Sequence, residues 1–221
     1  MYDWVSITSK LHSPQEFINL LGLDQEAIYW EKTKGAHGYK DRLYWESISI
    51  HYNGAYGMGI WLEMSGQGCR AFESFGNGDY NALFELVLDN PDHMNITRLD
   101  IAFDDHSGIL DISDICQDTE DGNYVSRSST WQVTYSNGGS SVTLGSRSSE
   151  ILIRIYDKAA ERGFTDGRHW VRVELQLRRE RARAFLALRG ILGRSSRESS
   201  EIMCVILLSL IRMTPTVGAG Q

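Results

Sequence analysis

Apolar and polar residues alternate from the first residues of the chain, and this alternation predicts a strand over residues 2–8 (YDWVSIT). The segment that follows, PQEFINLL at residues 14–21, has the signals of a short helix. Ser13 precedes it as an N-cap, Pro14 takes its first position and Gly22 ends it. The chain is therefore predicted to begin with a strand and a helix.

Aromatic and β-branched residues are concentrated in two further segments, residues 42–52 and 57–64. The NGAYG sequence that joins them is typical of a hairpin turn. Residues 80–88 (YNALFELVL) are predicted to be helical and to stop at Asn90-Pro91. The first part of the chain is thus predicted to run strand, helix, strand, strand, helix.

The second part of the chain repeats this order of elements. Residues 95–104 alternate as a strand, residues 111–117 begin a helix, and residues 170–177 alternate again before an Ala- and Leu-rich helical segment at 178–189. Three more strands are predicted between them, at residues 130–135, 142–145 and 150–156. We therefore predict an α+β fold of two related antiparallel-sheet units with helices packed on one face.

The predicted folded part covers residues 1–193, as two fused units at roughly 1–92 and 93–193. Residues 194–221 differ from it, because they combine a Ser/Arg stretch, an apolar patch without helical polarity and an end rich in small residues. We expect this tail to be atypical, either disordered or frameshifted.

Composition and charge narrow the function. A net charge of −7 and a pI near 5.4 do not suit a protein that binds DNA by bulk attraction to phosphate. Residues 150–190, however, hold ten Arg or Lys against six acids, an excess of four positive charges. Cys69, Cys116 and Cys204 show no CxxC spacing, there is no signal-peptide pattern, and the apolar run at 203–211 is too short to span a bilayer. We expect a cytoplasmic protein with no membrane partner.

Polar residues at alternate positions of three predicted strands carry the candidate chemistry. In LDIAFD, Asp100 and Asp104 are four residues apart and fall on the same strand face. Two carboxylates on one face repel each other unless a cation lies between them, and hard oxygen ligands suit Mg²⁺ or Mn²⁺. The alternative is a solvated strand end, which the neighbouring Asp105 supports.

The second of these strands, ILIRIYDK, places Arg154, Tyr156 and Lys158 on one face. Positive neighbours favour the charged form of a tyrosine, and the same cations could hold a phosphodiester. The alternative is a tyrosine that covers the core while its hydroxyl meets water.

The third strand, WVRVELQ, places Arg172, Glu174 and Gln176 on one face. Glu174 is a candidate metal ligand or base, and Arg172 a candidate phosphate contact, although an exposed Arg–Glu pair would look the same. Taken together, the three strands indicate a site that binds a metal, holds a phosphodiester and attacks it in line.

The stretches YDWVSIT, LEMSGQGCRAFE, ITRLDIAFDD, GSRSSEILIRIYDKAAE and WVRVELQLRRERA resemble the replication initiation factor family, which contains initiators of rolling-circle plasmids and related relaxases of integrative conjugative elements. This family differs from initiators that hold their metal with an HxH pair, and this chain contains no HxH. The Gly66-Gln67-Gly68 sequence within the resemblance is predicted to be a tight loop.

The resemblance implies that Tyr156 is the nucleophile of a DNA nicking-joining enzyme and forms a 5′-phosphotyrosine. It implies that Asp100, Asp104 and Glu174 gather Mg²⁺ or Mn²⁺. The strand faces, and not the resemblance, add Arg154, Lys158 and Arg172 as further candidate catalytic residues.

The implied partner of such an enzyme is single-stranded or hairpin DNA at an origin of replication or transfer. A second copy of the chain and a helicase are further candidate partners. Two alternatives remain at this point: a DNA-binding remnant without turnover, and a metal-dependent phosphodiesterase that uses activated water, with Tyr156 only positioning the substrate.

Overall fold

The chain divides into two compact units in a computed structural model that describes residues 1–126, 128–192 and 211–213. The first unit contains residues 1–101 and the described part of 177–194, and the second contains residues 102–176 with 211–213. The sequence prediction instead placed the division at residue 92 and kept residues 177–193 in the second part. Apart from residues 211–213, the predicted atypical tail lies outside the described residues.

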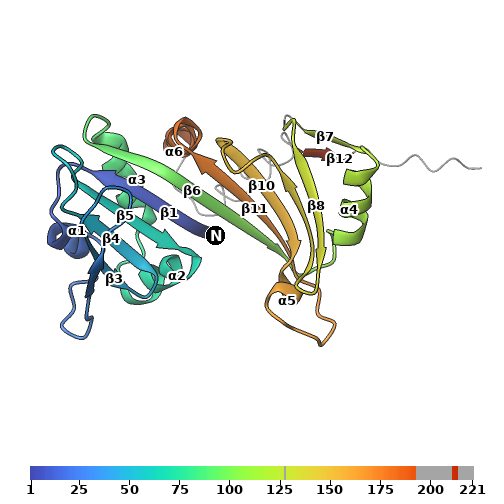
Figure 1. Ribbon diagram of the computed structural model, residues 1–221, viewed down its shortest axis with the longest axis horizontal. Coiled ribbons are helices and arrows are strands. Elements are labelled where there is room, and N and C mark those ends of the chain that lie inside the picture. Colours follow the sequence, from blue (N-terminus) through green and yellow to red (C-terminus); the bar gives the residue numbers. More distant parts are fainter. Residues whose placement is uncertain (127, 193–210, 214–221) are drawn as a thin grey trace, which may run out of the picture. The chain divides into compact units, whose positions relative to one another are not determined.

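A mixed α+β architecture, as predicted, organises the first unit (Figure 1). Its strands are antiparallel neighbours in the order β2 (Glu31–Lys34), β3 (Asp41–Trp45), β4 (Ile48–Tyr52), β5 (Ile60–Ser65), β1 (Tyr2–Ser9) and β6 (Met94–Asp105). Its helices are α1 (Pro14–Leu20), α2 (Gly66–Phe75), α3 (Tyr80–Asp89) and α6 (Glu180–Leu192). Helix α2 packs on β1, β4 and β5, while α1 lies on β4 and α3 on α6.

Alternation along the strands separates an apolar face from a polar one. In β1, Val5 and Ile7 have no exposed surface and belong to the core, whereas the Ser6 hydroxyl between them lies 2.7 Å from that of Thr97. The Trp61 indole also donates to Ser6, at 2.6 Å. The period-two pattern that predicted the strand therefore also determined which of its side chains the helices cover.

The second unit contains the strands that carry most of the candidate chemistry. The end of β6 is followed across the sheet by β11 (Val171–Arg178), β10 (Ile151–Asp157), β9 (Gly139–Leu144) and β8 (Trp131–Ser136). Helix α4 (Ile112–Glu120) packs on β8, β9 and β10, and α5 (Lys158–Glu161) is one turn at the end of β10. A separate ribbon pairs β7 (Tyr124–Ser126) with β12 (Ile211–Met213).

Local sequence signals located several elements correctly. Ser13 forms a capping box with Glu16, since each accepts a hydrogen bond from the other's backbone N–H. The helix start predicted at residue 111 is confirmed, since the side chain of Asp111 caps α4. The predicted turn NGAYG connects β4 to β5. None of the described helices has the length and apolarity required to cross a lipid bilayer.

Two features of the first unit differ from the prediction. The run at 42–52 is two strands, because Glu46 and Ser47 both have positive φ, 41° and 65°, and form a turn. The charged strand β2 was missed because its sequence, EKTK, has no apolar alternation. Strands β7 and β12 and the single turn of α5 were also not predicted.

The prediction of a tight loop at Gly66-Gln67-Gly68 is wrong, since these residues begin helix α2. A Cβ at Gly68 would overlap the carbonyl oxygen of Ser47. Glycine is therefore required here by close packing of the helix against the turn, and not by a left-handed backbone conformation.

We expect Gly59→Ala to destabilise the protein more than Gly57→Ala. Both glycines have positive φ, so each substitution costs about 1–2 kcal/mol of backbone strain. Only at Gly59 would the new Cβ overlap backbone, the carbonyl of Ser9 at the junction of β1 and β5, which adds roughly 1–3 kcal/mol. Urea denaturation of both variants measures the difference, and equal losses would contradict this close approach.

Candidate active site

Tyr156 lies near the end of β10, on the strand face opposite Ile153 and Ile155. All three side chains are buried, and Tyr156 is only 7% exposed. Its hydroxyl donates to Oε2 of Glu174, on the adjacent strand β11, at 3.3 Å. The ammonium of Lys158 donates to the same hydroxyl oxygen at 3.5 Å. The phenol is therefore held between a carboxylate and an ammonium.

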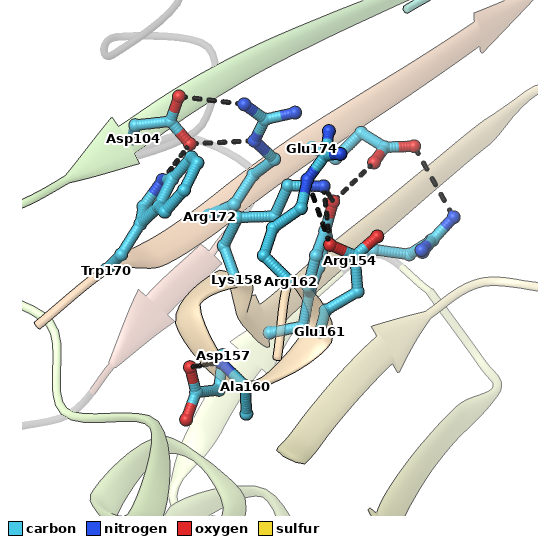
Figure 2. A network of polar contacts seen from close by, with 11 residues as sticks. Asp104, Arg154, Asp157, Lys158, Ala160, Glu161, Arg162, Trp170, Arg172 and Glu174 are labelled. Carbon is cyan, nitrogen blue, oxygen red and sulfur yellow. Dashed lines mark hydrogen bonds and ion pairs between the residues drawn. The ribbon is translucent and has the colours of Figure 1, made fainter. Parts of the chain in front are cut away.

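Arg154 and Lys158 flank the ring of Tyr156. Alternation along β10 accounts for Arg154, whereas Lys158, predicted on the same strand face, is the first residue of α5. The guanidinium carbon of Arg154 lies 5.1 Å from the ring centroid, and Nζ of Lys158 lies 5.4 Å from it. Arg154 pairs with Glu174 at 3.5 Å and Lys158 pairs with Glu161 at 2.9 Å (Figure 2). The side chain of Arg154 is 47% exposed, so it presents a cation to solvent, whereas Lys158 is buried.

A second group of polar contacts joins β6 to β11 and involves Asp104. Arg172 donates to both oxygens of this carboxylate, at 2.7 and 2.8 Å, and the indole N–H of Trp170 donates to Oδ1 at 2.8 Å (Figure 2). Burial alone would raise the pKa of Asp104, but the hydrogen bonds from Arg172 and Trp170 outweigh it and lower that pKa. Asp104 is thus an anion that orients Arg172.

The pKa of Tyr156 is raised, which differs from the effect expected of its cationic neighbours. Burial of the phenol is the largest cause and the carboxylate of Glu174 adds to it, while Arg172 and Arg154 act in the opposite direction without compensating. The sequence interpretation considered only the cations on the same strand. It did not include the effect of the Glu174 carboxylate, which lies on the adjacent strand, on the pKa of Tyr156. Because this pKa is raised, the hydroxyl keeps its proton at neutral pH.

The three carboxylates implied as metal ligands each have another partner. Asp100 accepts a hydrogen bond from Nε of Arg98 at 2.9 Å, Asp104 is held by Arg172, and Glu174 accepts from Tyr156. Across the described residues, no three His, Cys, Asp or Glu side chains are grouped so that they could hold a metal. Residues four apart on a strand are also about 13 Å apart, too far for one ion. The side chains as placed do not fit the implied set of ligands.

Asp105, next to Asp104 at the end of β6, holds the following turn and was not among the predicted site residues. Its buried carboxylate accepts hydrogen bonds from Ser107 and from the Leu110 backbone N–H, and it lies 3.2 Å from Nε2 of His169. Burial opposes ionisation, but these hydrogen bonds dominate and lower the pKa of Asp105. The Asp-x-Ser spacing of an Asx turn was the signal in the sequence that could have identified it.

Comparison with known families places this site in context. Residues 1–88 match the family described as "Rolling Circle replication initiation protein N-terminal domain", and residues 94–216 match the family described as "Replication initiation factor". The chain belongs to the replication initiation factor family. The resemblance drawn from the sequence is therefore confirmed, and the match continues past residue 194, where the predicted tail begins.

Two individual relatives support membership of the replication initiation factor family. The chain is 28% identical over 198 residues to the "Putative DNA relaxase NicK" of Bacillus subtilis (strain 168), covering 82% of this chain and 56% of that protein. It thus spans little more than half of that relative's length. The structure of a rolling circle replication initiator protein from Geobacillus stearothermophilus matches with a TM-score of 0.86 and 27% identity, covering 100% of this chain and 88% of that chain.

We expect Asp104→Asn to lower the free energy of unfolding by about 3 kcal/mol in EDTA at pH 7, because it breaks a buried pair and leaves Arg172 without its anion. The folded pKa of Asp104 is lowered, so its contribution is complete above the unfolded pKa of about 3.9 and is lost as pH falls through the folded value. The difference between wild type and Asp104→Asn in urea denaturation should therefore narrow below about pH 4.

The sign of this change separates two roles for Asp104. If it belonged to a cluster of mutually repelling carboxylates, Asp104→Asn would stabilise the metal-free protein, and that result would contradict the pairing with Arg172. Asp92→Asn, at an exposed position, serves as the control and should leave stability within about 0.5 kcal/mol of wild type.

Proposed function

We propose that this family member nicks one strand of DNA at an origin of replication or transfer, with Tyr156 as the nucleophile and a 5′-phosphotyrosine as the intermediate. The observation that carries the proposal is the hydrogen bond from the Tyr156 hydroxyl to Glu174, since it joins a nucleophile to a base. The family and the relative described as a relaxase are consistent with this reaction.

In the proposed step the Tyr156 oxygen attacks the phosphorus of a phosphodiester in line with the 3′ oxygen. Glu174 accepts the phenolic proton as the O–P bond forms, and the P–O3′ bond breaks. Glu174 passes this proton, directly or through water, to the 3′ oxygen, which leaves as a hydroxyl. Because the phosphotyrosine is again a phosphodiester, attack by a 3′ hydroxyl reseals the strand and returns the proton to Tyr156 without ATP.

The cations of the site have distinct proposed roles. Arg154 is half exposed beside the Tyr156 ring, so we assign it the contact with the phosphate of the scissile bond. Lys158 is buried within 3.5 Å of the phenolic oxygen and stabilises the charge that develops there. Arg172 is also buried, and its positive charge partly offsets the rise that burial and Glu174 cause in the pKa of Tyr156, so we propose that it supports the nucleophile.

The resemblance implies Mg²⁺ or Mn²⁺ as cofactor, and we retain this as a proposal that rests on family membership. Such a cation would supply Lewis-acid stabilisation of the phosphoryl oxygens. Asp100, Asp104 and Glu174 are engaged by other side chains, so none of the steps proposed for Tyr156 depends on the metal.

DNA is the proposed partner, as a single strand or a hairpin, and a second copy of the chain and a helicase are proposed further partners in replication. The buried, protonated Tyr156 favours one other function, a DNA-binding protein without turnover. That alternative predicts salt-sensitive binding to DNA with no covalent product.

We expect Tyr156→Phe to abolish formation of a covalent protein–DNA adduct, because phenylalanine has no oxygen to attack phosphorus. The measurement is a denaturing gel of protein incubated with Mn²⁺ and oligonucleotides from the origin region of the element that encodes the chain. Tyr135→Phe is the control, since Tyr135 is a 61% exposed tyrosine on β8 of the same unit. Adducts formed equally by both variants would assign the nucleophile elsewhere. No adduct with wild-type protein that binds the same DNA would favour the alternative.

We expect Glu174→Gln to slow adduct formation roughly a hundredfold or more at pH 7, because the amide cannot accept the phenolic proton. The deficit should shrink as pH rises towards 10. The pKa of Tyr156 is raised, so its phenolate is scarce at neutral pH, and each increase in pH supplies more nucleophile that needs no base. Single-turnover rates at several pH values measure this effect. A constant deficit at all pH values would give Glu174 a role other than that of a base.

A further inference from the structure

An exposed aromatic side chain stands beside the candidate active site without a role in the proposed reaction. Residues 161–169, which connect α5 towards β11, are all exposed, and Phe164 in this segment has 40% of its surface accessible. A single exposed phenylalanine needs no explanation by itself. Phe164 is distinguished by the flat side chains that lie against it.

Phe164 belongs to a row of flat side chains. Its ring centroid lies 6.3 Å from that of Trp170, at an interplanar angle of 33°, and the ring of His106 lies 5.2 Å from Trp170 at 40°. The guanidinium of Arg168 lies 3.8 Å from the centre of the Phe164 ring. We refer to His106, Phe164, Arg168 and Trp170 as the aromatic row.

The aromatic row has accessible surface at both of its outer members. His106 and Arg168 are exposed, and Trp170 is partly exposed. The Nε and terminal nitrogen of Arg168 are bonded to Asp166, at 2.5–3.0 Å, so its edge is occupied by a carboxylate. Arg168 therefore offers a planar surface for stacking more than an unpaired charge for a phosphate.

Trp170 connects the aromatic row to the groups beside the nucleophile. Its indole N–H donates to Asp104, which holds Arg172, and the guanidinium of Arg172 lies 6.0 Å from the Trp170 ring. Burial and Glu174 raise the pKa of Tyr156, and Arg172 is one of the two arginines that partly offset this rise. The backbone also connects the aromatic row to these groups, since the N–H of Lys158 donates to the carbonyl of Trp170 at 2.8 Å and the N–H of Phe164 to that of Ala159 at 2.9 Å. Lys158 and Ala159 follow the strand end that carries Tyr156, so a nucleotide whose phosphate reaches Tyr156 would have its base, or that of its neighbour, near these rings.

From this arrangement we infer that the aromatic row is a stacking subsite for an unpaired nucleobase of single-stranded DNA, next to the phosphate that Tyr156 attacks. The inference rests on the proposed function. Every base has a π-face, so stacking on aromatic rings and on an Arg guanidinium binds single strands with little sequence preference. In a duplex the two faces of each base are covered by its neighbours, so the subsite selects DNA that is already unpaired.

The test compares two single-stranded probes, a fluorescein-labelled oligothymidine and an oligonucleotide of equal length made of abasic residues. Fluorescence anisotropy in EDTA measures binding of each probe to the whole chain. Wild-type protein should bind the oligothymidine at least about fivefold more tightly. Phe164→Ala should reduce this ratio by about fivefold and leave affinity for the abasic probe unchanged, because the phosphate contacts remain. Phe164→Trp should preserve the ratio.

Phe103→Ala is the matched control, because Phe103 is an equally exposed phenylalanine of the same unit, 39% exposed, on β6 next to Asp104 and on the opposite strand face. It should leave the ratio as in wild type. The inference is overturned if Phe164→Ala keeps the wild-type ratio, or weakens binding to both probes equally.

The anisotropy measurement records binding without cleavage of the probes, so its result does not depend on whether Tyr156 nicks DNA. A normal preference for bases without any Tyr156 adduct on origin DNA would reject the nicking function and retain the subsite. An adduct together with an unchanged ratio in Phe164→Ala would reject the subsite alone.

Discussion

The paired hydrogen bonds between Asp104 and Arg172 are the interaction on which the rest of the candidate site depends. They connect β6 to β11, and Trp170 adds a third hydrogen bond to the same carboxylate. Because side chains two apart on a strand share a face, an Arg172 held in place also fixes the face that presents Glu174 to Tyr156. A buried ion pair contributes little net stability after desolvation, so its principal effect here is geometric.

The environment of Tyr156 combines two opposing demands. Burial places the hydroxyl at a defined position beside Glu174, but it also raises the pKa of the phenol. A protonated phenol reacts as a nucleophile when a base removes its proton during attack. In the proposed reaction Glu174 is that base, because it already accepts the hydrogen bond of the Tyr156 hydroxyl.

The negative net charge of the chain does not extend to the candidate site, where cations lie beside Tyr156. A net charge of −7 gives no general attraction to DNA, yet Arg154 presents a half-exposed cation next to the phenol. Lys158 and Arg172 are buried close to it. The proposed affinity for DNA therefore rests on local contacts with phosphate and base, and less on the long-range field that a basic protein would provide.

The sequence by itself determined most of the longer strands, their faces and four of the described helices, α1, α3, α4 and α6. Period-two alternation placed Arg154 and Tyr156 on one strand face, and Ser13 marked a helix start as its N-cap, because these signals act between residues close in the chain. Only the tertiary structure decided which strands are neighbours. The order of β6, β11 and β10 in the sheet pairs Asp104 with Arg172 and Tyr156 with Glu174. In these pairings the two carboxylates bind other side chains and do not face each other across a common ion. Pairing across a sheet depends on contacts far apart in sequence, which no local pattern contains.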